Sequence, residues 1–109
     1  MGDYLALSGH RAIDALSSFY ADKLIFSCKG LDIDRGICDS NDDFSSVKRK
    51  MLKSAKMKIL AADLSKFSKA AFSKIADIGD IDVVVTDACP EEGWQTSLAE
   101  RDVKCLYPV

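Results

Sequence analysis

Residues 58–66, KILAADLSK, decide the fold class of this sequence. The first five form a short apolar run that ends at the polar segment 63–66. Three more short apolar runs occur along the chain, at residues 23–28 (KLIFSC), 81–86 (IDVVVT) and 103–107 (VKCLY). Nearly continuous apolar runs of this length are typical of strands buried on both faces, as in a parallel sheet.

Amphipathic segments separate these runs. Residues 12–20 carry apolar side chains at helical spacing. A second helix is predicted over 44–55, after residues that can cap it, and a third from Pro90, at a first helical position, to Glu100. The alternation predicts an α/β fold, a Rossmann-like, mainly parallel sheet with flanking helices, in which runs 23–28, 58–62 and 81–86 are neighbouring central strands.

Two segments fit this alternation less directly. Residues 29–40 contain two glycines and several aspartates, so they are predicted to be a loop. Residues 70–78 are compatible with either a helical turn or an edge strand around Phe72 and Ile75.

Length and composition set further bounds. The chain has 109 residues, of which 48% are hydrophobic and 29% charged, with a formal net charge of −2, as expected for one ordinary globular domain. No apolar run approaches the roughly 20 residues needed to span a bilayer, and the start lacks a signal-peptide pattern. We therefore expect a cytoplasmic protein without membrane partners.

The sequence also argues against several kinds of site. Cys28, Cys38, Cys89 and Cys105 are irregularly spaced, so we expect reduced thiols, with Cys28 and Cys105 in the core. With His10 as the single histidine, no metal site is expected. No glycine-rich nucleotide-binding motif is present, and no cofactor is predicted.

Charge is unevenly distributed. Residues 48–74 contain nine basic residues and one acid, Asp63, which makes the segment +8. Such a block is compatible with a solvated face, with nucleic acid or with a small anion, and charge alone does not separate these. Because the basic residues lie partly on a helix and partly in loops, without a recognition-helix pattern, we expect no DNA-reading surface here.

Lys48 is the most informative basic residue. On a helical projection it falls in the middle of an apolar arc formed by Phe44, Val47, Met51, Leu52 and Ala55. A buried ammonium needs an anionic partner. The partner could be a ligand, or Asp32 or Asp63 within the protein. Alternatively, the long side chain could reach solvent.

Ligands of parallel sheets bind beyond the carboxyl ends of the strands. The loops at those ends hold Gly30 and Asp32 after the first run, and Asp63, Ser65 and Lys66 after the second. An ammonium beside a hydroxyl and exposed backbone N–H groups suits a phosphate or a sugar hydroxyl. Exposed loop residues and ordinary turn formers would give the same pattern.

Taken in order, several short pieces resemble the C-terminal effector-sensing domain of DeoR-type bacterial transcriptional regulators. The resemblance runs from about Ser8 to Pro108. It rests on the order and spacing of these pieces: Gly9 with Ala15-Leu16 and Ala21-Asp22-Lys23, Gly30-Leu31-Asp32 with Gly36, Val47-Lys48-Arg49, Ala62-Asp63-Leu64-Ser65-Lys66-Phe67, Ile81-Asp82 and Thr86-Asp87.

The resemblance implies a fold similar to ribose-5-phosphate isomerase and a sensor for phosphorylated sugars or related metabolites. It implies that residues 1–109 are a partial sensor domain, with the sheet incomplete on its N-terminal side and the helix-turn-helix DNA-binding domain absent. The implied ligand-binding residues are Gly30, Asp32, Lys48, Asp63, Ser65 and Lys66. Uncovered sheet edges and apolar surface also predict a homo-oligomer.

The same resemblance argues against catalysis. Aligned on Ala62-Asp63-Leu64-Ser65-Lys66, the catalytic glutamate of the isomerase falls at Lys48, and an ammonium cannot act as a general base. We therefore predict that the chain is the non-enzymatic sensor domain of a transcriptional regulator, of the repressor type, of sugar metabolism. The alternatives are an isomerase-like or transferase enzyme of sugar-phosphate metabolism and a bare dimerisation module.

Overall fold

The computed structural model describes residues 21–108, so the helix predicted over 12–20 lies outside the described residues. Its main feature is a four-stranded parallel sheet with the order β1-β4-β6-β7. The strands are β1 (Ala21–Phe26), β4 (Ala55–Ala61), β6 (Val83–Val85) and β7 (Lys104–Leu106). The predicted parallel α/β sheet and the adjacency of its first three strands are confirmed.

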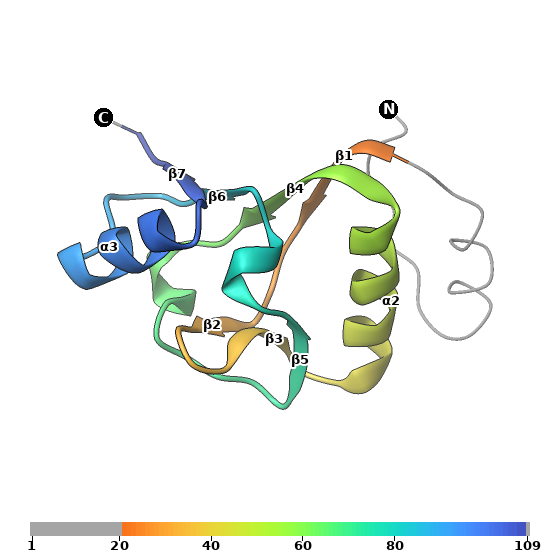
Figure 1. Ribbon diagram of the computed structural model, residues 1–109. Coiled ribbons are helices and arrows are strands. Elements are labelled where there is room, and N and C mark those ends of the chain that lie inside the picture. Colours follow the sequence, from red (N-terminus) through yellow and green to blue (C-terminus); the bar gives the residue numbers. More distant parts are fainter. Residues whose placement is uncertain (1–20, 109) are drawn as a thin grey trace.

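Helix α2 (Asp42–Lys53) lies beside β1 and β4 (Figure 1). It begins two residues earlier than predicted, because the Asn41 side chain accepts a hydrogen bond from the Phe44 N–H (2.9 Å) and caps the helix there. Phe44 was expected in the buried arc, and this expectation is wrong: its side chain is 44% exposed. Ser45 takes the buried position instead and donates its hydroxyl to the Ser73 carbonyl.

A small antiparallel sheet occupies the segment predicted to be a loop. Strands β2 (Gly30–Asp32) and β3 (Gly36–Asp39) form a hairpin, and β5 (Ser73–Ala76) pairs with β3, which confirms the edge-strand alternative for residues 70–78. The loop prediction failed because Leu31 and Ile37 are fully buried and hold the hairpin against the core. Gly36, at φ +86°, supplies the left-handed residue that the turn needs.

Helix α3 (Glu92–Glu100) lies beside β7 (Figure 1). Pro90 was predicted at its first position, and this is wrong, because Glu91 is the N-cap and Pro90 precedes it. Two short 3₁₀ helices complete the fold: η1 (Leu64–Lys66) after β4, and η2 (Ile78–Asp80) before β6.

The two faces of the parallel sheet differ. Leu24, Phe26, Leu60 and Val84 point into a core shared with α2 and α3. The alternate side chains of the strands point to the opposite face, and several of them are exposed. The large exposed apolar side chains on that face are Ile25, Met57, Val85 and Leu106. Within residues 21–108, the prediction that the strands are buried on both faces is therefore confirmed for one face of the sheet only.

All four cysteines are free thiols. Cys28 is buried in the core as predicted, and Cys105 is half-buried and packs against the core. Cys38 is also buried, which the sequence did not predict. Burial raises the pKa of Cys28 to about 11, so this thiol stays protonated at neutral pH. No helix within the described part of the chain has the length and apolar character needed to cross a bilayer.

Candidate site at the carboxyl edge of the parallel sheet

The carboxyl ends of the parallel strands lie side by side. The Ala62 N–H, just after β4, donates to the Val85 carbonyl (3.0 Å), and the Thr86 N–H, just after β6, donates to the Leu106 carbonyl (2.9 Å). Since β1 pairs with β4 up to Phe26 and Leu60, the segments that follow these two strands leave the sheet at the same edge. This is the edge at which the sequence places a ligand.

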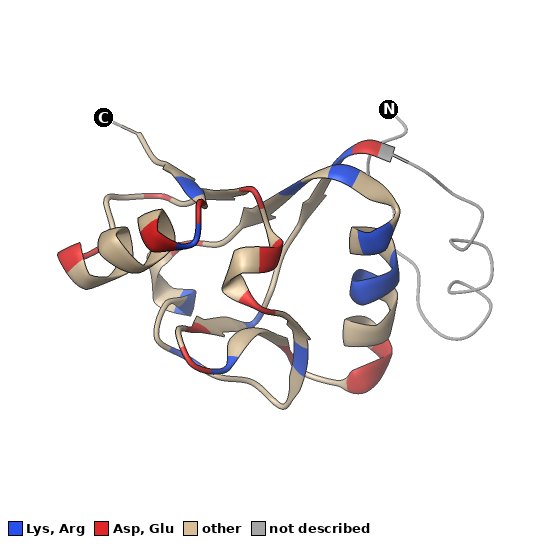
Figure 2. Cartoon of the chain, viewed as in Figure 1, with Lys and Arg blue, Asp and Glu red and all other residues tan. Residues whose placement is uncertain are grey.

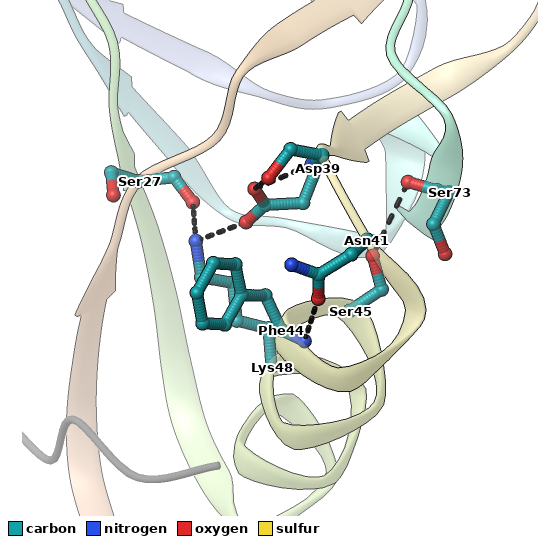
Figure 3. A network of polar contacts seen from close by, with 8 residues as sticks. Ser27, Asp39, Asn41, Phe44, Ser45, Lys48 and Ser73 are labelled. Carbon is teal, nitrogen blue, oxygen red and sulfur yellow. Dashed lines mark hydrogen bonds and ion pairs between the residues drawn. The ribbon is translucent and has the colours of Figure 1, made fainter. Parts of the chain in front are cut away.

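Lys48 reaches this edge from α2 (Figure 3). Its Nζ donates to the Ser27 carbonyl (2.7 Å) and to Asp39 Oδ2 (2.5 Å). The Lys48 side chain is 22% exposed and that of Asp39 3%. The sequence anticipated an internal pair with Asp32 or Asp63, and neither is the partner found.

The sequence gives no sign of a role for Asp39, because segment 29–40 has the composition of a loop. As the last residue of β3 it is buried, and its Oδ1 accepts a hydrogen bond from the Ser40 N–H (2.7 Å). Its carboxylate therefore has partners on both oxygens. Lys48 joins three elements through this contact: α2, the end of β1 and the hairpin.

Asp63 begins the loop after β4 and caps η1. Its Oδ1 accepts hydrogen bonds from the Ser65 N–H (3.1 Å) and the Ser65 hydroxyl. The hydroxyl hydrogen bond is the main cause that lowers the pKa of Asp63, and the positive charges of Lys66 and Lys69 lower it further. Asp63 is therefore an ionised acceptor at neutral pH.

Asp87, after β6, fixes the same loop from the next strand. Its Oδ1 accepts the Leu64 N–H (2.9 Å) and the Thr86 hydroxyl (3.3 Å). The sequence resemblance included Thr86-Asp87 without giving either residue a role. Their position directly after a buried apolar run was the signal available.

Gly30 lies against the segment that follows η1. A Cβ at this position would stand 2.5 Å from the Lys69 carbonyl oxygen, so the close approach requires glycine. Leu31 pairs with Phe67, and the Lys69 N–H donates to the Leu31 carbonyl (3.2 Å). These contacts place Gly30 beside the loop that carries Asp63, Ser65 and Lys66.

Asp32 and Lys66 differ in whether their charged groups already have partners within the protein. The Asp32 carboxylate accepts the N–H groups of Asp34 (3.1 Å) and Arg35 (3.0 Å) and so closes the hairpin turn. Lys66 is half-buried, and it forms no ion pair with any residue from 21 to 108. Of the predicted site residues, Lys66 thus carries the ammonium that remains available to a ligand.

A groove of about 390 Å³ adjoins this loop on the side of α3. Phe67 and Trp94 line it and meet edge-to-face at 4.9 Å between ring centroids. The Trp94 indole N–H donates to the Ser68 hydroxyl oxygen (2.9 Å), which fixes the ring. The edge thus combines charged and hydroxyl groups with an aromatic wall.

No group of histidine, cysteine or acidic side chains among residues 21–108 is arranged to hold a metal ion. A parallel α/β sheet with polar groups gathered at its carboxyl edge is the architecture of small-molecule-binding α/β domains.

Comparison with known proteins places the chain within that class. Residues 2–88 match the family described as the DeoR C terminal sensor domain. The chain belongs to this family of sensor domains of DeoR-type regulators. The resemblance inferred from the sequence is therefore confirmed.

Among curated relatives, the chain is 32% identical over 100 residues to an uncharacterized HTH-type transcriptional regulator, YulB, of Bacillus subtilis, with 92% of this chain and 39% of that protein covered. It is 33% identical to the transcriptional repressor GlcR of Bacillus subtilis, with 92% and 38% covered. It is 28% identical to the deoxyribose operon repressor of Escherichia coli, with 84% and 36% covered. The chain thus spans about two fifths of the length of these relatives.

Proposed function

We propose that this chain is the effector-sensing part of a repressor of sugar metabolism and that it binds a phosphorylated sugar or a related metabolite at the carboxyl edge. The proposed ligand-binding residues are Gly30, Asp32, Lys48, Asp63, Ser65 and Lys66. The observation that carries the proposal is the position of Lys66, an ammonium that forms no ion pair with residues 21–108, near the ionised Asp63 and the Ser65 hydroxyl.

The residues divide the work by chemistry. Lys66 holds the anionic group, since a flexible ammonium meets a phosphate from many directions. Asp63 accepts hydrogen bonds from sugar hydroxyls, with Ser65 keeping it oriented. Gly30 holds the hairpin close to the backbone of Lys69 and so sets the position of the loop that carries Lys66.

Lys48 and Asp32 contribute differently because both already have partners. Lys48 is held by Asp39 and by the Ser27 carbonyl, so it supplies positive charge from a fixed position. Asp32 closes the hairpin turn through Oδ2, so its other carboxylate oxygen can accept a hydrogen bond from a sugar hydroxyl. A ligand touching both would sense the geometry of the hairpin relative to α2.

Three relatives carry names that refer to sugar operons or to repression: the deoxyribose operon repressor, the L-fucose operon activator of Haemophilus influenzae and GlcR. By analogy we propose that the whole protein is a cytoplasmic homo-oligomer that contacts DNA only through an N-terminal helix-turn-helix domain. Effector binding shifts its conformation or assembly only as far as the ligand prefers one state over the other.

Calorimetric titration of the 109-residue chain with pentose and hexose phosphates, and with the same sugars unphosphorylated, tests the site. We expect a phosphorylated sugar to bind and its free sugar to bind much more weakly. Lys66→Gln should weaken binding about tenfold, as for one charge-assisted contact. Exposed Lys56→Gln on β4 is the control. Equal binding by both lysine variants, or no binding by any sugar phosphate, would contradict the proposal.

A further inference from the structure

A second groove lies at the opposite end of the parallel sheet from the carboxyl edge. It has a volume of about 520 Å³ and is formed where α2 ends, β4 begins, and β5 and η2 pass beside them. Such a volume falls within the roughly 300–1,000 Å³ typical of small-molecule sites. The groove shares no lining residue with the carboxyl-edge groove.

The charged lining of this groove is mostly basic. Arg49, Lys53 and Lys58 line it, and Asp80 is its single acidic lining residue. The Asp80 carboxylate accepts the Asp77 N–H (3.0 Å) and so is engaged in capping η2. The lining therefore presents excess positive charge to whatever enters the groove.

The three basic side chains differ in how they are held. Arg49 donates to the Lys74 carbonyl and, through Nη2, to the Ser46 hydroxyl oxygen (3.0 Å), which fixes its guanidinium. Lys53 and Lys58 form no ion pair with any residue in the described range 21–108. Two free ammonium groups thus stand beside one preorganised guanidinium.

A helix effect explains only part of this arrangement. Basic residues in the last turn of a helix are favoured by its dipole, and Figure 2 shows the basic residues on the later turns of α2 and the acidic ones at its start. That accounts for Lys53. It does not account for Lys58, which comes from β4 and meets the same groove.

The uncharged part of the lining is apolar. Leu52 from α2 and Ile75 from β5 contribute to it, and both belong to the hydrophobic core. The groove is therefore an opening onto the edge of the core with cations around it. A ligand that fits has an apolar body and an anionic group.

We propose that this groove is a second small-molecule site, for an organic anion whose phosphate or carboxylate is bound by Lys53 and Lys58 and whose apolar body covers Leu52 and Ile75. Arg49 adds fixed positive charge beside the anion. The site stands apart from the carboxyl edge, so it does not depend on the proposed sugar-phosphate function.

Titration of the ¹⁵N-labelled chain with phenyl phosphate, followed by amide chemical shifts, tests this site. We expect saturable shifts at Lys53, Lys58 and Ala76. Inorganic phosphate should bind at least about tenfold more weakly, because it buries no apolar surface. Lys58→Gln should weaken phenyl phosphate binding about three- to fivefold, as for one partly exposed charge pair, and the double variant with Lys53→Gln should weaken it further.

Two variants separate this site from others. Lys69→Gln removes an exposed lysine outside the groove, and Lys66→Gln alters the proposed effector site; both should bind phenyl phosphate at the groove as the unmodified chain does. Unsaturable shifts, equal binding of inorganic phosphate, or unchanged affinity in the double variant would overturn the proposal. A loss confined to Lys66→Gln would also overturn it, while supporting the carboxyl-edge site.

Discussion

The two ends of the parallel sheet use positive charge in different ways. At the carboxyl edge, Lys48 is bound to the buried Asp39 and to a backbone carbonyl, and the loop after β4 is fixed by Asp63 and Asp87. At the amino end, Lys53 and Lys58 line a groove without ion-pair partners in the described chain. The first arrangement is built into the fold, and the second is added to its surface.

This difference teaches that a run of basic residues in a sequence is not one feature. The +8 segment 48–74 includes a structural lysine, a lysine available at the carboxyl edge and the basic residues of a groove, beside other lysines that belong to none of these. Removing the charge of Lys48 should therefore damage folding, whereas removing that of Lys66, Lys53 or Lys58 should affect binding only.

The largest effect is expected for Lys48→Met. From the sequence alone this substitution should leave the fold intact, because it removes a charge from an apolar arc. The structure reverses that expectation, since the change leaves the buried Asp39 carboxylate without its cation. We expect the free energy of unfolding to fall by about 2 kcal/mol, measured by urea denaturation.

The control for this prediction is Lys56→Met, an exposed position on β4, which should change stability by less than about 0.5 kcal/mol. Adding Asp39→Asn to Lys48→Met should recover part of the loss, because the buried group is then neutral. A Lys48→Met chain as stable as the Lys56→Met chain would show that the ion pair is not structural.

A smaller but sharp effect is expected at two glycines. Gly36→Ala forces a side chain into a left-handed conformation and against the Ala76 carbonyl, so it should destabilise the hairpin by about 1.5 kcal/mol. Gly93→Ala, in α3, meets nothing within 4 Å and should stabilise by about 0.5–1 kcal/mol. Thermal unfolding of both variants checks the pair, and equal effects would contradict the hairpin geometry.

The smallest effect is expected for Ser65→Ala. Loss of the Ser65 hydroxyl should raise the pKa of Asp63 toward its ordinary value, because that hydrogen bond is the main cause of the lowered pKa. A lowered carboxyl pKa stabilises the fold at pH values above the ordinary carboxyl range, and this gain disappears as the pH falls. Any stability difference between the two chains should therefore be present at neutral pH and vanish in acid. Carboxyl ¹³C titration of both chains measures the shift; identical midpoints would contradict it.

The parallel sheet was predictable from sequence because its strands lie in short, nearly continuous apolar runs, such as residues 81–86, separated by amphipathic segments. The hairpin was not, because no continuous apolar run marks its strands and its glycines and aspartates are typical of loops. Its only apolar signal was the pair Leu31 and Ile37.

The candidate site, like the fold, was predictable only in part. Asp63 and Ser65 follow a recognisable strand, and the structure places them together as expected. The partner of Lys48 was not predictable, because Asp39 lies on the unrecognised hairpin and the contact depends on how that hairpin packs against α2. Long-range pairing of this kind leaves no local pattern.

Mapping a bound sugar phosphate onto the chain tests the central claim most directly. The ¹⁵N-labelled chain is titrated with the sugar phosphate that binds best in calorimetry, and amide shifts are assigned. We predict that the largest saturable shifts fall at Gly30 and at residues 63–66, with smaller ones at Ser27. Shifts concentrated at Lys53 and Lys58, at the other end of the sheet, would contradict the account.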